Sequence, residues 1–370
     1  MILITFALSL SACGDDDDES AESIDNEPEQ EIDQTPGQSP VTPTYGVNAA
    51  LYEGLQVDEL VSTGLSGFGV NMCVVDSGID ADHPAFAHTV ARGALVWRDF
   101  TTEASPTPID TNGHGTHVTG ILAMDGELTG GAPNVNLFIA RVFLREGGAS
   151  YETIGSAVDW CRDQGADVIS MSLGGLSLPA ITELLDEDAT ATEEAVERAL
   201  AAGIYVVAAA GNTELARDVA SPANVSGVIA VGAVQQDLET KAAFSQSGIN
   251  DGTLLIAPRT DPDKKPEVVA PGVSVAAPMI DDSIYDCSGL YCELSGTSQA
   301  TPFVSAILAL VLEAEPDLQQ ENLTGTLADA IGRMKNALMD TAAPRTDQDL
   351  PHDDGLGYGL IQASELLDAF

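Results

Sequence analysis

The feature that most constrains the fold of this chain is the alternation of short apolar runs with segments of helical periodicity. Residues 153–164 and 191–202 have apolar side chains at the spacing of an amphipathic helix. Strands that alternate with such helices form a mostly parallel sheet with helices on both faces, so the sequence predicts an α/β fold. The apolar runs that we interpret as buried strands cover residues 70–75, 137–142, 168–171, 204–208 and 228–231.

Three further helices are predicted toward the C-terminus, over residues 302–314, 322–339 and 364–369. No repeat and no change of composition divides residues 45–370. We therefore expect residues 45–370 to form one domain.

Acidic residues outnumber basic residues by 58 to 14, which gives the chain a formal net charge of −44. Residues 1–50 contain eleven of the acidic residues and neither Lys nor Arg. A surface of this charge repels nucleic acid and anionic lipid, so we expect neither as a binding partner. Two explanations of the charge stay open. One is a salt-rich environment or bound cations, which screen the repulsion, and the other is the ordinary surface of an acidic exported protein.

The N-terminal residues have the pattern of an export signal. Residues 1–10 form an apolar run too short to span a bilayer, and it fits the core of a secretory signal although no basic residue precedes it. The tetrapeptide that ends at Cys13 resembles a bacterial lipobox, in which this cysteine carries lipid. We expect residues 14–44 to be an acidic disordered tether and the protein to be a cell-envelope lipoprotein, held at the membrane only through Cys13. The alternative is an ordinary cleaved signal and an extracellular protein.

Four other cysteines allow two disulfides in an exported chain. Cys287 and Cys292 flank a short segment that contains glycine, so they are close enough to be bridged. Cys73 lies on a predicted strand, and Cys161 lies on the predicted helix that should cross over it, so a second bridge is geometrically possible. The alternative for this second pair is two reduced cysteines in the core. None of the spacings is typical of a zinc site.

Three polar segments interrupt the apolar framework, and each contains a residue type that serves in nucleophilic catalysis. Asp76 ends a predicted strand, His114 lies at the start of a predicted helix, and Ser298 precedes the helix over 302–314. Alone, each could be a turn cap, a hydrogen-bonded loop histidine or a helix cap. Together they supply the orienting carboxylate, the base and the nucleophile of a serine hydrolase. Their order along the chain argues against α/β-hydrolase lipases and esterases, in which Ser precedes Asp and His.

These segments resemble the motifs of the subtilisin family of serine peptidases over nearly all of residues 45–370. The resemblance implies a three-layer subtilisin-like fold and a serine endopeptidase that acts on polypeptides. We expect a monomer that requires no cofactor. The alternative function is a lipid-anchored peptide-binding protein on the same fold that has lost activity. The motifs are Tyr45-Gly46-Val47-Asn48, Asp76-Ser77-Gly78-Ile79-Asp80, His114-Gly115-Thr116-His117-Val118, Ser172-Leu173-Gly174-Gly175, Ala208-Ala209-Ala210-Gly211-Asn212 and Gly296-Thr297-Ser298-Gln299-Ala300-Thr301-Pro302.

The resemblance also implies a catalytic role for individual residues. Ser298 would attack the scissile carbonyl, His114 would accept and return the proton, and Asp76 would orient His114. Asn212 would stabilise the oxyanion together with the backbone N–H of Ser298. His117, one helical turn after His114, would be structural.

The substrate is expected to bind as an added strand beside Ser172, Leu173 and Gly174. Its side chain would enter a pocket lined by Ala210 and Gly211. Ala220 is expected at the wall of this pocket, where the family commonly has glycine, so the pocket is expected to be narrow. These assignments also come from the resemblance.

One departure from the family pattern concerns calcium. The strong calcium site of the family uses an Asp directly after the His-Pro of the aspartate motif and a loop beyond the histidine helix. Here Ala85 follows His83-Pro84, and the loop over 123–128 is short. We therefore expect no calcium at that site, although calcium could still bind elsewhere as a structural ion.

Overall fold

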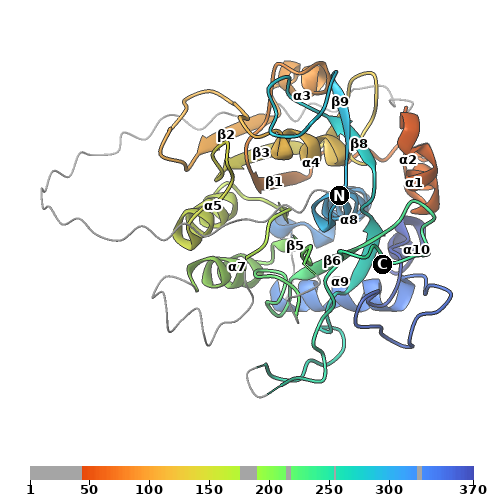
Figure 1. Ribbon diagram of the computed structural model, residues 1–370. Coiled ribbons are helices and arrows are strands. Elements are labelled where there is room, and N and C mark those ends of the chain that lie inside the picture. The colour runs from red at the N-terminus through yellow and green to blue at the C-terminus, as the bar shows by residue number, and fades with distance from the viewer. Residues whose placement is uncertain (1–43, 176–189, 214–217, 254–255, 323–326) are drawn as a thin grey trace, which may run out of the picture.

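The computed structural model describes residues 44–175, 190–213, 218–253, 256–322 and 327–370. Within them, a seven-stranded parallel sheet has the strand order β2-β3-β1-β4-β5-β6-β7, and a hairpin of β8 and β9 forms a separate antiparallel pair (Figure 1). The strands are β1 Asn71–Asp76, β2 Leu95–Asp99, β3 Asn136–Arg141, β4 Val168–Met171, β5 Tyr205–Ala209, β6 Ile229–Val234, β7 Val268–Pro271, β8 Val275–Pro278 and β9 Tyr291–Leu294.

Helices cover both faces of the sheet. On one face α5 and α7 lie side by side and contact β1, β3 and β5, as Figure 1 shows. On the other face α4 packs on β1, and α8 packs on α4 and on β4 to β7. The helices are α1 Ala49–Gly54, α2 Val57–Ser62, α3 Ala87–Ala91, α4 His114–Ala123, α5 Tyr151–Asp163, α7 Ala191–Ala201, α8 Thr297–Ala314, α9 Leu327–Thr341 and α10 Ala363–Asp368.

The predicted α/β architecture is confirmed, and the five predicted strands correspond to β1, β3, β4, β5 and β6. All residues of β3 to β7 are buried, which explains why most of these strands read as continuous apolar runs. Strand β2, a partly exposed edge strand that contains Arg98 and Asp99, was not predicted. Strand β7, a four-residue strand that ends at Pro271, was not predicted either.

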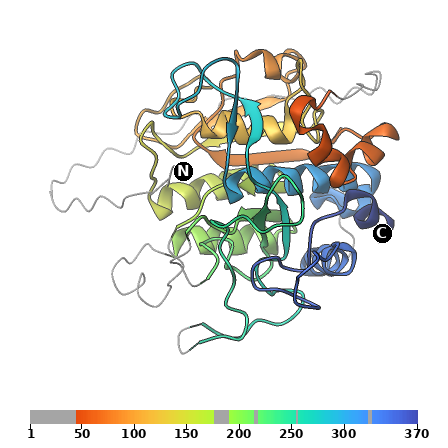
Figure 2. The same ribbon diagram turned by 45° about the vertical axis from the view of Figure 1, so that its right-hand side comes forward.

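Helix α8 begins at Thr297, five residues earlier than predicted. The prediction began at Pro302, but a proline is tolerated in the interior of this helix. Proline lacks an N–H, so the carbonyl of Ser298, four residues before it, loses its helical partner. The Ser172 hydroxyl donates to this carbonyl at 2.8 Å instead. In Figure 2, α8 runs through the middle of the molecule, and although it is long and apolar enough to cross a membrane, 83% of it is buried in the protein.

Both predicted disulfides are present. Cys73 on β1 is bonded to Cys161 on α5, and Cys287, in the segment between β8 and β9, is bonded to Cys292 on β9. The Cys73–Cys161 bridge can form because α5 packs on β1 and β3. Cys13, residues 1–13 and all of the predicted tether except Thr44 lie outside the described residues.

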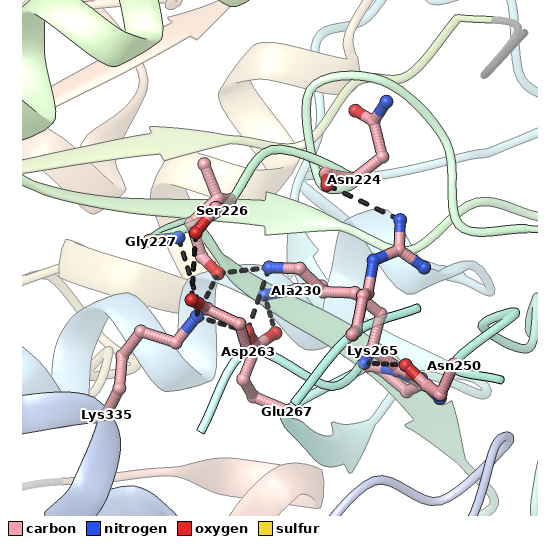
Figure 3. A network of polar contacts seen from close by, with 12 residues as sticks. Asn224, Ser226, Gly227, Ala230, Asn250, Asp263, Lys265, Glu267 and Lys335 are labelled. Atoms are coloured by element: carbon pink, nitrogen blue, oxygen red, sulfur yellow. Dashed lines mark hydrogen bonds and ion pairs between the residues drawn. The ribbon is translucent and has the colours of Figure 1, made fainter. Parts of the chain in front are cut away.

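A buried network of charges joins α9 to the residues that come just before β6 and β7 (Figure 3). The ammonium groups of Lys265 and Lys335 both bind Glu267 Oε1, at 2.8 and 2.6 Å. Lys335 also binds Asp263, and both lysines donate to the backbone carbonyl of Val228. Two lysines therefore face two carboxylates, of which Glu267 is buried and Asp263 is partly exposed.

The network is sensitive to the loss of a single member because Lys265, Glu267 and Lys335 are almost completely buried. Burial lowers the pKa of Lys265 to about 7, which reflects the cost of a charge in this environment. For Lys335, the nearby carboxylates outweigh burial and raise the pKa. Lys335 is therefore the firmly charged member on which Asp263 and Glu267 depend.

We expect Lys335→Met to lower the free energy of unfolding by about 3–5 kcal/mol, because it removes the firmly charged cation from the buried carboxylate of Glu267 and leaves only Lys265, whose charge is disfavoured by burial. Urea denaturation of the variant and of the unmodified protein measures the difference. Lys264→Met is the matched control, since Lys264 makes a partly exposed pair with Asp261, and it should cost no more than about 1 kcal/mol. Equal losses in the two variants would contradict this account of the network.

Candidate active site

The site lies at the carboxyl edge of the parallel sheet. Asp76 ends β1, Ser172 follows β4, and Asn212 lies just after β5. These three strands are adjacent and parallel, so their carboxyl ends lie together. The N-terminal turns of α4 and α8 meet this edge through hydrogen bonds to the same three residues, and this position is the usual one for a ligand site in a parallel α/β sheet.

The first of these contacts joins Asp76 to His114, the first residue of α4. His114 Nδ1 is 2.8 Å from Asp76 Oδ1 and 3.0 Å from Oδ2. Asp76 is fully buried, and Oδ1 also accepts a hydrogen bond from the backbone N–H of Ser77 at 2.7 Å. With Nδ1 donating to the carboxylate, the lone pair of a neutral imidazole lies on Nε2, where it can accept a proton.

The environment of His114 favours its protonated form. Burial by itself would lower the pKa of His114. The charge of Asp76 and the hydrogen bond to it act in the opposite direction, together with the charge of Asp110, and the net effect raises the pKa. An imidazolium that forms at His114 is therefore stabilised by two carboxylates.

The second contact joins Ser298, the second residue of α8, to Ser172. Ser298 Oγ donates to the Ser172 carbonyl at 3.0 Å, and Ser172 Oγ donates to the Ser298 carbonyl at 2.8 Å. The carbonyl of Ser298 is available for this second bond because of Pro302. The pair positions the first turn of α8 on the carboxyl end of β4.

The third contact orients the side-chain amide of Asn212. Its Oδ1 accepts hydrogen bonds from the backbone N–H and the hydroxyl of Thr297, at 2.8 and 2.9 Å. With its oxygen engaged in this way, the amide presents its donor Nδ2 on the other side. The Thr297 hydroxyl also accepts from the N–H of Gly211 at 3.1 Å, so it links two of the predicted site segments.

The residues predicted to bind substrate are brought together around Ala220. The Ala220 N–H donates to the Ala210 carbonyl at 2.8 Å, and a Cβ at Gly174 would lie 2.7 Å from the Ala220 side chain. Gly174 is exposed, whereas Ser172 and Leu173 are buried. Residues 176–189, which follow this segment, are outside the described part of the chain.

Gly211 has a positive φ of 110°, and a Cβ there would lie 1.9 Å from Gln246 Oε1. Glycine is therefore required for the chain to turn here and place Asn212 against α8. This is the physical reason for the glycine that the sequence analysis noted in this segment.

His117 lies on α4 away from these groups. Its Nε2 is 3.0 Å from the carbonyl of Cys292, and burial lowers its pKa to about 3. A neutral, fully buried histidine in this position joins α4 to the β8–β9 hairpin. The geometry fits the structural role that we expected for it.

Two contributors to the site were missed in the sequence analysis. Thr297 carries the hydrogen bonds that orient Asn212, and Asp110 contributes charge beside His114. The run Asp110-Thr111-Asn112-Gly113 is typical of a turn that caps a following helix, and this was the available signal. Thr297 had no comparable signal, because its partner is distant in the sequence.

The described residues contain no group of three or more His, Cys, Asp or Glu side chains arranged to hold a metal ion. In the short loop beyond α4, the Asp125 carboxylate accepts hydrogen bonds from the Thr89 hydroxyl and the His88 N–H. The calcium content of the protein stays a prediction.

Comparison with known proteins gives consistent matches. A sequence profile of the "Subtilase family" matches residues 67–359. Subtilisin DY of Bacillus licheniformis is 34% identical over 280 residues, which cover 74% of this chain and 88% of that protein. Serine protease AprX of Bacillus subtilis (strain 168) is 32% identical over 312 residues, which cover 77% of this chain and 66% of that protein. The crystal structure of a cold adapted subtilisin-like serine proteinase aligns with a TM-score of 0.59 at 27% identity, covering 81% of this chain and 90% of that one.

Proposed function

Since the chain belongs to the subtilase family and is a serine endopeptidase, we propose that Asp76, His114 and Ser298 are its catalytic triad and that Asn212 completes the oxyanion hole. The observation that carries the proposal is the pair of contacts at the sheet edge, His114 to Asp76 and Ser298 to Ser172. The alternative of an inactive peptide-binding protein on the same fold finds no support, because each of the four residues is present and hydrogen-bonded.

In the proposed reaction, Ser298 Oγ leaves the Ser172 carbonyl and attacks the scissile carbonyl carbon. His114 Nε2 takes the hydroxyl proton and delivers it to the leaving amine. Asp76 keeps His114 in the tautomer with Nδ1–H and stabilises the imidazolium. Water then attacks the acyl carbon, His114 takes a proton from the water and returns it to Ser298 Oγ, and the carboxylic acid product leaves.

Charge develops on the carbonyl oxygen during each attack. We assign its stabilisation to Asn212 Nδ2 and to the backbone N–H of Ser298 at the N-terminus of α8. The fixed orientation of the Asn212 amide by Thr297 supports this assignment, because a donor held in place needs no rearrangement as the charge appears. A donor of this kind is worth about 100- to 1000-fold in kcat.

Substrate is proposed to bind as an extended strand beside Ser172, Leu173 and Gly174. The side chain before the scissile bond would enter a pocket between this segment and Ala210-Gly211. The Ala220 N–H donates a hydrogen bond to the Ala210 carbonyl, and the Ala220 methyl group faces Gly174. The methyl group therefore narrows the space between the segment at Gly174 and the segment at Ala210. We therefore propose a preference for small side chains at this substrate position.

We expect Ser298→Ala to lower kcat by a factor on the order of 10⁶ while the melting temperature changes by only a few degrees. A fluorophosphonate reagent should label the unmodified protein at Ser298, and the labelled site can be identified by mass spectrometry. Ser62→Ala, which changes an exposed serine on α2, should still be labelled and active. Casein cleavage by Ser298→Ala, or folded protein that resists the reagent, would refute the triad assignment.

Ala220→Gly should widen the proposed pocket. We compare two peptide anilides, with Phe or with Ala before the scissile bond. The ratio of kcat/KM for the Phe peptide to kcat/KM for the Ala peptide should rise about tenfold or more, because one methyl group in a close-fitting pocket has an effect of this size. Ala104→Gly is the control, since Ala104 is exposed and already has a positive φ of 46°. An unchanged ratio in Ala220→Gly would exclude Ala220 from the pocket wall.

We propose that the protein is exported and anchored by lipid on Cys13, with residues 14–44 as its tether, and that it acts as a monomer. Two disulfides support export, because such bonds persist in oxidising compartments. The acidic composition supports a membrane attachment that depends on the lipid alone, because the rest of the chain is repelled by anionic lipid.

Cys13→Ala should move the protein from the detergent phase to the aqueous phase in a Triton X-114 partition, because it removes the acyl chains. Ser11→Ala keeps the cysteine and should stay in the detergent phase. Detergent partition by Cys13→Ala would rule out the lipid anchor, and aqueous partition by the unmodified protein would favour an ordinary cleaved signal.

A further inference from the structure

Asp110 lies four residues before His114 and is partly buried. Its carboxylate accepts five hydrogen bonds. Oδ1 accepts from the Ser77 hydroxyl at 3.0 Å and from the N–H groups of Asn112 and Gly113, both at 2.9 Å. Oδ2 accepts from the N–H and the hydroxyl of Thr116, at 2.9 and 2.7 Å. One side chain therefore holds the end of β1, the turn before α4 and the first turn of α4.

The first turn of α4 is capped by side chains alone. The first N–H groups of a helix have no partner inside the helix, and their orientation sets the direction in which the helix leaves. Here three successive N–H groups bind three different side chains, and one of these, Ser77, follows Asp76 directly. The bonds run from His114 N to Asn112 Oδ1 (3.2 Å), from Gly115 N to Ser77 Oγ (2.8 Å) and from Thr116 N to Asp110 Oδ2 (2.9 Å).

The end of β1 and the start of α4 also approach as closely as their backbones allow. A Cβ on Gly115 would lie 2.2 Å from the carbonyl oxygen of Gly78. Gly78 and Asp110 form an isolated antiparallel bridge, and the Asp80 N–H donates to the Thr116 hydroxyl at 3.0 Å. Besides its direct bonds to Asp76, His114 is thus positioned by backbone contacts that include Asp110 or residues bound to it.

The carboxylate of Asp110 also offsets the unfavourable interaction between a protonated His114 and the dipole of α4. His114 is the first residue of α4, where the positive end of the helix dipole disfavours an imidazolium. Among the described residues, Asp110 is the carboxylate that acts together with Asp76 on β1 to raise the pKa of His114. His117 on α4 is neutral, and Tyr285 from the β8–β9 turn stays neutral because burial, with Asp76 and Asp110 nearby, raises its pKa.

We propose that Asp110 is a positioning residue for catalysis, which holds His114 against Asp76 through Ser77 and the first turn of α4 and supplies the charge that offsets the helix dipole when the imidazolium forms. This inference rests on the proposed role of His114 as the base. It assigns Asp110 no contact with substrate.

The test is the pH profile of kcat/KM for a peptide anilide, measured on the full chain for Asp110→Asn and Ser77→Ala. The acid limb reports protonation of the free His114, which then cannot accept a proton. Asp110→Asn removes the charge that favours protonation, so its acid limb should move to lower pH. The variant should also lose about tenfold or more in kcat/KM, because small displacements of a catalytic group are costly.

Ser77→Ala breaks the link between β1 and α4 but keeps the carboxylate. It should lower kcat/KM with the acid limb in its original place. Asp82→Asn removes an exposed charge from the same loop after β1 and should change neither quantity. An acid limb that stays in place in Asp110→Asn overturns the electrostatic role. A kcat/KM within twofold of the unmodified protein in both site variants overturns the positioning role.

If circular dichroism shows that Asp110→Asn does not fold, Thr116→Val takes its place. This change removes the hydroxyl hydrogen bond at 2.7 Å and preserves shape, so it should lower kcat/KM without moving the acid limb, and undiminished kcat/KM overturns the positioning role. Labelling of the unmodified protein at Ser298 tests the triad separately. A protein that is labelled but insensitive to these variants refutes this inference alone.

Discussion

A carboxylate buried at the end of a central strand sets the arrangement of this active site. Asp76 is fully buried, so its negative charge is tolerated only if hydrogen-bond donors surround the carboxylate. The backbone N–H of Ser77 and the ring of His114 are those donors. His114 reaches Asp76 because α4 begins at this point, and α4 begins here because the turn over 110–113 and Ser77 cap its first turn. The catalytic histidine that we propose is thus positioned by the need to satisfy a buried charge.

The other half of the site is organised by backbone groups of α8 that lack helical partners. Pro302 leaves the Ser298 carbonyl free, and Ser172 at the end of β4 binds it. Thr297, in the first turn of the same helix, binds the side chain of Asn212 after β5. One helix N-terminus therefore joins two adjacent strands. The nucleophile and the oxyanion donor that we propose are held by the same rigid elements, which favours the precise geometry that catalysis needs.

The charges of the molecule are distributed very unevenly. Of the few basic side chains, Arg141, Lys265 and Lys335 are buried and paired with carboxylates. These cations balance charge inside the protein and do little to neutralise its surface. The surface is therefore left with most of the acidic excess, and the repulsion that results is opposed by the large apolar core and by the disulfide between β1 and α5.

The sequence by itself determined the fold class and the identity of the candidate site residues. Buried parallel strands appear as apolar runs, and the polar residues that interrupt them at Asp76, His114 and Ser298 are conspicuous for that reason. Spacing within the chain was also enough for the Cys287–Cys292 pair, because its two members are close in sequence. These features depend on local pattern or short separation, which a sequence displays directly.

Only the tertiary structure decided which groups contact one another across the fold. The start of α8 at Thr297 depends on a hydrogen bond from Ser172, more than a hundred residues away. The bond from the Ser77 hydroxyl to Asp110 and the bond from Thr297 to Asn212 form only when α4 and α8 reach the sheet edge. The lysine pair around Glu267 forms only when Lys335 on α9 reaches Glu267 and the backbone carbonyl of Val228. The free energy of a buried polar group is set by neighbours that folding assembles, and for that reason a local pattern alone does not reveal these contacts across the fold.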